Sequence, residues 1–171
     1  MQTSIRKIMS LPDYVTVLNL LSGILSIFSA IHGKFVLASV LLFAAVFFDM
    51  IDGYIARKMH LEADFGAELD SLGDLVSFGV APMVLIMTFY NTTWLSIIAL
   101  ALPICGALRL ARHNINRNAT HGFLIGIPIT MSGLIIPFVI FLDLNIYVAA
   151  VITAGLSASY LSSRRVNKLL S

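Results

Sequence analysis

The chain has 171 residues, of which 58% are hydrophobic and 12% are charged, and its formal net charge at pH 7 is +2. A soluble domain keeps roughly a quarter of its residues charged, so this composition excludes a water-soluble globular protein. The length suits one domain, residues 1–171, without a separate soluble module. No nucleic-acid-binding pattern is present, and the composition predicts an integral membrane protein.

Apolar runs follow one another along the chain, each with about the 20 residues that a helix needs to cross a bilayer. No alternating, strand-like pattern recurs, so helices are the expected spanning elements. The predicted spans are Pro12–Ile31, Phe35–Arg57, Phe65–Tyr90, Trp94–His113, Phe123–Leu142 and Ile146–Ser162. The first run has no clear cleavage site and is interpreted as a retained helix rather than a signal peptide. The sequence therefore predicts an all-α bundle of six transmembrane helices.

Basic residues fall almost entirely on one of the two sides that six spans would create. Those on the favoured side are Arg6, Lys7, Arg57, Lys58, Arg109, Arg112, Arg117, Arg164, Arg165 and Lys168. Only Lys34 falls on the other side. The positive-inside rule then places both termini on the cytoplasmic side of the cytoplasmic membrane. Residues 1–10 are expected to form either a short amphipathic helix along the lipid headgroups or a basic tail.

Four aspartates interrupt the second and third apolar runs. Asp49 and Asp52 are three residues apart and Asp70 and Asp74 are four apart, so each pair shares one helix face. The connecting turn is short, which makes the two helices antiparallel and brings both pairs to one depth, within about 14 Å of the cytoplasmic helix ends. Clustered carboxylates repel and are costly at membrane depth. A carboxylate-only set suits Mg²⁺, Mn²⁺ or Ca²⁺, and four carboxylates could hold two ions.

Small residues accompany the aspartates. Gly53 follows Asp52, Ala56 lies one helical turn further on, and Gly66 is expected to face Gly53 across the hairpin. Such residues let a ligand or a second helix approach the backbone closely. Arg57, at the expected mouth of the site, could meet a phosphate. Ordinary helix packing would explain one such aspartate but not four in register.

These residues form one pattern, Asp49-x2-Asp52-Gly53-x2-Ala56-Arg57-x8-Gly66-x3-Asp70-x3-Asp74. The pattern resembles the signature of the CDP-alcohol phosphotransferase family at every fixed position. The resemblance implies a membrane enzyme with a six-helix core, commonly a homodimer, that displaces CMP from a CDP-linked alcohol with a second alcohol. It implies that all four aspartates bind divalent metal, Mg²⁺ or Mn²⁺, and that Asp74 is also the general base. It implies that Gly53, Ala56, Arg57 and Gly66 line the CDP-lipid site, facing the cytoplasm.

Further segments resemble the membrane-bound phosphatidylserine synthase branch of this family, among them "LPDYVTVLNLLSG", "LRLARHNI" and "FLIGIPI". That resemblance implies CDP-diacylglycerol or CDP-archaeol as the donor within the membrane lipid and L-serine as the acceptor. Two positions depart from the branch: Asp13 stands where Asn is frequent, and Thr130 stands where a second proline is usual.

Several residues outside the signature are candidates for binding. Arg109 and Arg112, three apart on one face, could hold the serine carboxylate or the lipid phosphate, or could simply flank the membrane. Asn114 could orient the amino acid. Thr16 and Asn19 could reach the nucleotide or bond between helices.

Two alternatives to the serine reaction stay open at this point. One is the same chemistry with glycerol phosphate or inositol phosphate as acceptor, for which the arginines could supply a cationic pocket. The other is a cation transporter that uses the carboxylates for permeation. Transport fits less well because the outer half of the predicted bundle is almost without polar groups, apart from Asp143.

Overall fold

The computed structural model describes residues 9–59, 64–116, 123–125, 127–162 and 165–167. Its helices are α2 (Leu11–Ile31), α3 (Phe35–Met59), α4 (Asp64–Asp74), the π-helix η1 (Leu75–Val80), α5 (Ala81–Tyr90), α6 (Thr93–Ala99), α7 (Ala101–Asn116), α8 (Thr130–Phe141) and α9 (Ile146–Leu161). Two short strands, β1 (Phe123–Ile125) and β2 (Arg165–Asn167), pair antiparallel. The predicted amphipathic segment 1–10 and the basic residues Arg117, Arg164 and Lys168 lie wholly or largely outside the described residues.

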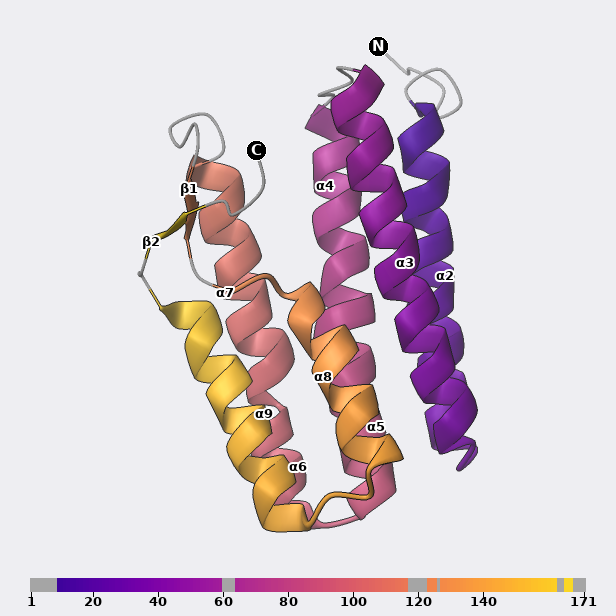
Figure 1. The fold of residues 1–171 in the computed structure, drawn as a ribbon, viewed down its shortest axis with the longest axis vertical. Coiled ribbons are helices and arrows are strands. Elements are labelled where there is room, and N and C mark those ends of the chain that lie inside the picture. The colour runs from indigo at the N-terminus through magenta and orange to yellow at the C-terminus, as the bar shows by residue number, and fades with distance from the viewer. Residues whose placement is uncertain (1–8, 60–63, 117–122, 126, 163–164, 168–171) are drawn as a thin grey trace.

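The helices form one bundle in which successive segments alternate in direction, with α4, η1 and α5 stacked end to end as one segment and α6 and α7 as another (Figure 1). Four stretches are long and apolar enough to cross a membrane: Leu11–Ile31, Phe35–Met59, Phe65–Tyr90 and Thr93–Ile115. The apolar helices α8 and α9 are shorter, with 12 and 16 residues. The prediction of a helical membrane protein is therefore confirmed.

The predicted start of the fifth span, at Phe123, was wrong. Residues Phe123–Ile125 form strand β1, and the helix begins only at Thr130. Pro128 accounts for part of this difference, because the residue before a proline is disfavoured in helical conformation. A short apolar run also carries no periodicity that separates a strand from a helix.

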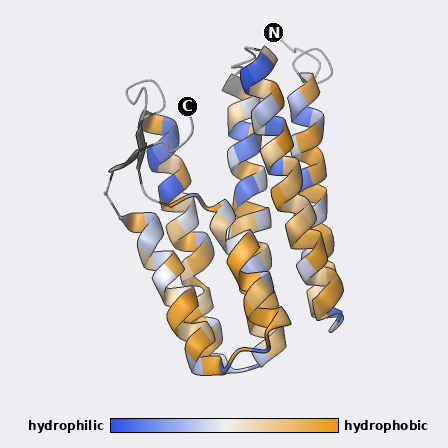
Figure 2. Ribbon diagram, viewed as in Figure 1, coloured by the Kyte–Doolittle hydropathy of each residue, from blue (hydrophilic) through white to orange (hydrophobic). Residues whose placement is uncertain are grey.

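The bundle is polar at one end and apolar at the other. Figure 2 shows hydrophilic residues gathered at the ends of α3, α4 and α7 that share the upper side of the view, whereas the lower halves of most helices are hydrophobic. Buried apolar side chains, including Leu42, Phe78, Leu85 and Ile136, form the core between α3, η1, α5 and α8. The polar end is where a site for a charged ligand can form.

Helix α2 differs from a core helix of a soluble protein, since its buried face is polar or small. The buried residues are Pro12, Asp13, Thr16, Asn19, Ser22, Gly23, Ser26, Ser29 and Ala30. Large apolar side chains such as Leu21, Ile24 and Phe28 are exposed on the opposite face. This inversion suits a lipid environment, where small residues and hydrogen bonds rather than burial of apolar surface join helices.

The π-helix η1 begins directly after Asp74, and its geometry has a local cause. Pro82 has no backbone N–H, so the carbonyl of Phe78 lacks the donor that an α-helix would supply. The hydroxyl of Ser132, on α8, donates to that carbonyl instead. On the other side, Gly23 of α2 lies so close to Ser77 that an added Cβ would overlap it. Wide turns of this kind are frequent at functional sites, and this one lies directly below the aspartates.

Candidate active site

A cavity of about 390 Å³ lies at the polar end of the bundle, among α2, α3, α4, α7 and the segment that leads into α8. The predicted site residues that line it are Thr16, Asp49, Asp52, Gly53, Ala56, Arg57, Gly66, Asp70, Asp74, Arg109 and Asn114. Asn19 and Arg112 are not among the lining residues. The structure thus brings predicted site residues that are up to 98 positions apart in the chain, Thr16 and Asn114, to one cavity.

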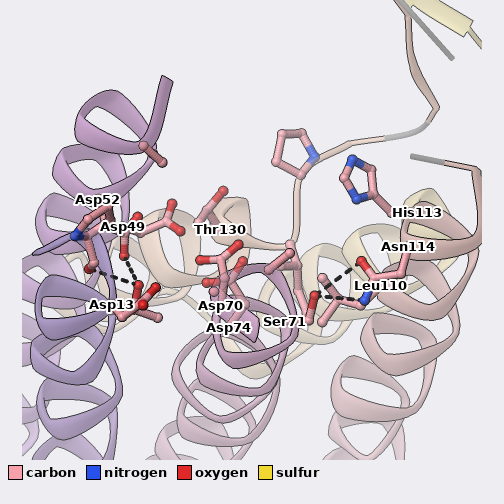
Figure 3. Close-up of a pocket in the computed structure, with 18 of the residues that line it drawn as sticks. Asp13, Asp49, Asp52, Asp70, Ser71, Asp74, Leu110, His113, Asn114 and Thr130 are labelled. Atoms are coloured by element: carbon pink, nitrogen blue, oxygen red, sulfur yellow. Dashed lines mark hydrogen bonds between the residues drawn. The ribbon is translucent and has the colours of Figure 1, made fainter. Parts of the chain in front are cut away.

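Three of the four aspartates meet in this cavity. Carboxylate oxygens of Asp49, Asp70 and Asp74 all lie within 4.8 Å of one another, with one group from α3 and two from α4 (Figure 3). Asp52 is not part of this triple, although it lines the same cavity. Hard divalent cations such as Mg²⁺ prefer oxygen ligands of this kind. The converging carboxylates therefore fit a divalent metal ion.

Helix α2 contacts the aspartates from the side. The hydroxyl of Thr16 donates to Oδ2 of Asp52 at 2.9 Å. One helical turn further along, Nδ2 of Asn19 donates to Oδ1 of Asp74 at 3.2 Å. Both α2 side chains are buried, and Asn19 is completely so. Two carboxylates from two different helices are thus each held by one neutral donor of α2.

The part of the cavity next to α2 and α3 is lined by small residues. A Cβ added to Gly66 would lie 2.6 Å from Oδ1 of Asp13. A Cβ added to Gly53 would lie 3.3 Å from a guanidinium nitrogen of Arg57. The absence of side chains at these positions therefore lets a carboxylate and a guanidinium group lie close to the helix backbone.

Asp13 is a cavity residue that was missed as a candidate. Its carboxylate is buried, and Oδ2 accepts from the backbone N–H of Ser10 at 2.6 Å and from the Ser10 hydroxyl at 2.9 Å. The sequence Ser10-Leu11-Pro12-Asp13 carries the signal that could have located it, because a serine followed three residues later by an acid is typical of a capped helix start. That signal predicts the cap but not the contact with the cavity.

The part of the cavity next to α7 and α8 is built differently. Arg109 is only 7% exposed, and its Nε has no hydrogen-bond partner among the described residues. Nearby, Asn114 donates through Nδ2 to the hydroxyl of Ser71 at 3.1 Å (Figure 3). His113 and Thr130 also line this part, and they were assigned no role from the sequence. A buried guanidinium with an unpaired N–H is suited to an anionic group of a ligand.

Arg112 does not line the cavity and instead contacts the end of α9. Its guanidinium donates to the backbone carbonyls of Tyr160, Leu161 and Ser162 at 3.1, 3.3 and 3.0 Å. These carbonyls belong to the C-terminal end of α9, where the last carbonyls of a helix lack intrahelical donors. The structure therefore brings Arg109 to the cavity and Arg112 to the end of α9.

The fold and the cavity together define an integral membrane protein of helices with a carboxylate site at one end of the bundle. The chain belongs to the CDP-alcohol phosphatidyltransferase family, which matches residues 9–159. This match confirms the family resemblance that the sequence pattern indicated.

Curated relatives of this chain carry more specific names. The CDP-diacylglycerol–serine O-phosphatidyltransferase of Methanocaldococcus jannaschii is 44% identical over 133 residues, which are 78% of this chain and 61% of that protein. The protein of the same name from Bacillus subtilis is 37% identical over 150 residues, 86% of this chain and 84% of that protein. The archaetidylserine synthase of Methanothermobacter thermautotrophicus is 38% identical over 139 residues, 77% of this chain and 58% of that protein. The chain thus spans about three fifths of the two archaeal relatives.

Proposed function

We propose that this protein transfers a phosphatidyl or archaetidyl group from a CDP-lipid to the hydroxyl of L-serine and releases CMP. The observation that carries the proposal is the position of the carboxylates Asp49, Asp70 and Asp74 between two unlike parts of one cavity. One part is floored by small residues and the other holds a buried arginine. The names of the relatives from three organisms support serine as the acceptor.

The carboxylates are proposed to hold two divalent ions, Mg²⁺ or Mn²⁺, with Asp49, Asp52, Asp70 and Asp74 as ligands. Bound ions would neutralise charge on the pyrophosphate and polarise the attacked phosphorus. The CDP-lipid is assigned to the part of the cavity next to α2 and α3. There Gly53, Ala56 and Gly66 leave room for the nucleotide diphosphate, and Arg57 supplies a cation for its phosphates.

Asp74 is the proposed general base. Its carboxylate takes the proton of the serine hydroxyl while the hydroxyl oxygen forms a bond to the lipid-bearing phosphorus. The bond between that phosphorus and the bridging oxygen breaks, and the oxygen leaves with CMP. The position of Asp74 supports this role, because it lines the cavity between the part that holds Arg109 and the part that holds Gly53 and Gly66.

Arg109 is the proposed partner of the serine carboxylate, with Asn114 and Ser71 beside it. Its buried Nε, which has no hydrogen-bond partner in the described part of the chain, supports this assignment, as does the position of Arg112 at the end of α9. A phosphorylated acceptor carries about two negative charges and would call for more than one guanidinium on this side. Among the described lining residues, Arg109 is the arginine on that side and Arg57 lies opposite, which favours an acceptor with a single anionic group.

The same proposal includes the topology. We place α8 and α9 across the membrane as the fifth and sixth spans, because they run alongside the longer segments and expose Phe138, Phe141, Val148 and Val151 (Figure 1). The start of α2 and the end of α9 then share the cytoplasmic side of the cytoplasmic membrane with the cavity, as the basic residues indicate. By family resemblance the protein is a homodimer.

An acceptor panel tests the proposed function. Purified protein would receive CDP-diacylglycerol or CDP-archaeol, Mg²⁺ or Mn²⁺, and one of L-serine, glycerol 3-phosphate or inositol phosphate, with CMP release as the readout. We expect CMP release with L-serine and none with the other two acceptors. Chelation of the metal should abolish the release. Release with glycerol 3-phosphate but not with serine would refute the acceptor assignment.

A further inference from the structure

Helix α2 carries a row of polar side chains along its buried face, and two of them contact the aspartates. Thr16 and Asn19 are three residues apart, so they lie on the same side of the helix, one turn after the other. Thr16 bonds to Asp52 on α3 at 2.9 Å, and Asn19 bonds to Asp74 on α4 at 3.2 Å. One helix therefore reaches carboxylates that belong to two others.

Each of these bonds involves one of the two oxygens of its carboxylate. Thr16 occupies Oδ2 of Asp52 and Asn19 occupies Oδ1 of Asp74, so in each group the second oxygen has no bond to α2. A donor on one oxygen restricts rotation of the side chain and directs the other oxygen. Because neighbouring carboxylates repel one another, such a restraint is most useful before a cation is bound.

Helix α2 is itself fixed next to Asp74. The hydroxyl of Ser77, in the π-helix that follows Asp74, donates to the backbone carbonyl of Asn19 at 3.1 Å. Gly23 allows α2 to approach Ser77 so closely that any side chain at that position would overlap it. Asn19 is completely buried, and its Oδ1 has no partner among the described residues. The donor to Asp74 thus sits on a backbone that is bonded to the segment carrying Asp74.

We propose that Thr16 and Asn19 are positioning residues for the metal site, with Thr16 holding Asp52 and Asn19 holding Asp74. This inference rests on the proposed function, since it assumes that the aspartates bind divalent metal. It gives the two α2 residues a different task from the nucleotide contact that the sequence suggested. Asn19, which does not line the cavity, acts through Asp74 rather than on a substrate.

The test measures metal binding directly, in addition to turnover. The full-length protein and its variants would be titrated with Mn²⁺, and the free ion would be followed by electron paramagnetic resonance. Thr16→Val and Asn19→Leu remove the donors at nearly constant size, and Thr16→Ser retains the hydroxyl. Ser22→Ala is the matched control, because its hydroxyl bonds to the carbonyl of Leu18 in its own helix at 2.8 Å.

We expect Thr16→Val and Asn19→Leu to weaken Mn²⁺ binding by about 10-fold to 100-fold, the usual effect of removing a group that orients a metal ligand. The same variants should need correspondingly more metal for half-maximal CMP release. Thr16→Ser should retain most of the Mn²⁺ affinity that Thr16→Val loses. Ser22→Ala should bind Mn²⁺ as the unmodified protein does. If Asn19→Leu fails to fold, the comparison of Thr16→Val with Thr16→Ser provides the test.

Unchanged Mn²⁺ affinity in folded Thr16→Val and Asn19→Leu would overturn the inference. If the KM for the CDP-lipid were raised in the same variants, direct contact with the nucleotide would be indicated instead. Failure of the unmodified protein to bind Mn²⁺ would instead refute the metal site of the proposed function, so the two failures are distinguishable.

Discussion

Replacement of Arg112 by alanine should lower stability without a large effect on acceptor binding. The guanidinium of Arg112 bonds to three carbonyls at the end of α9, and two of these bonds, at 3.0 and 3.1 Å, are partly buried. A hydrogen bond to a charged group contributes about 1.5–3 kcal/mol, and fixing an arginine side chain costs up to about 2 kcal/mol. The third bond, at 3.3 Å, is exposed and adds little. We therefore expect a loss of about 1–4 kcal/mol in the free energy of unfolding, from two such bonds less the cost of fixing the side chain.

Unfolding in mixed micelles would measure this loss, and steady-state CMP release would give the KM for serine. Arg112→Lys should be intermediate in stability, because one ammonium group cannot reach three carbonyls in the plane of a guanidinium. Arg109→Ala is the matched comparison. Loss of the proposed bond to the serine carboxylate should raise the KM for serine about 10-fold to 100-fold. A raised KM in Arg112→Ala with unchanged stability would show that the two arginines have been assigned the wrong way round.

Two further substitutions test the proposed base and the proposed nucleotide site. At saturating metal, Asp74→Asn should lower kcat at least about 100-fold, since the general base is lost, and affinity for the CDP-lipid should stay within a few-fold. Full activity would refute Asp74 as the base. Gly66→Ala places a Cβ 2.6 Å from Oδ1 of Asp13, so we expect a loss of about 1–3 kcal/mol in stability and a raised KM for the CDP-lipid. Gly155→Ala, where an added Cβ meets nothing within 4 Å, is its control, and equal behaviour of the two variants would contradict the close approach.

The meeting of carboxylates from α3 and α4 could be predicted from the sequence because it depends only on local rules. Spacings of three and four residues put each pair on one helix face, and a short turn sets the two faces at one depth. The separation of Asp52 from the other three could not be predicted in this way. Asp52 instead accepts a hydrogen bond from Thr16, which is 36 residues away in the chain and lies on α2.

The two arginines show the same limit. Three residues advance a helix by about 300°, so Arg109 and Arg112 differ by about 60° in direction. That difference is small enough for the sequence to predict both arginines on one face of the helix. It is also large enough to direct one guanidinium into the cavity and the other to the end of α9. The strand at Phe123–Ile125 was equally unpredictable, because its pairing partners in β2 lie 40 to 44 residues further along.

The two parts of the cavity are built from different elements, and this bears on how the acceptor could change within the family. The proposed metal and nucleotide side is built on α2, α3 and α4, which are joined by bonds between side chains of different helices and by close approach at Gly23. The proposed acceptor side is built on α7 and on the segment before α8, where Pro128 and Thr130 lie outside or at the start of a helix. Precise positioning of reacting groups favours rigid elements, whereas loops tolerate substitution. A change of acceptor is therefore expected to require substitutions around Arg109, Asn114 and Thr130, with the aspartates and α2 unchanged.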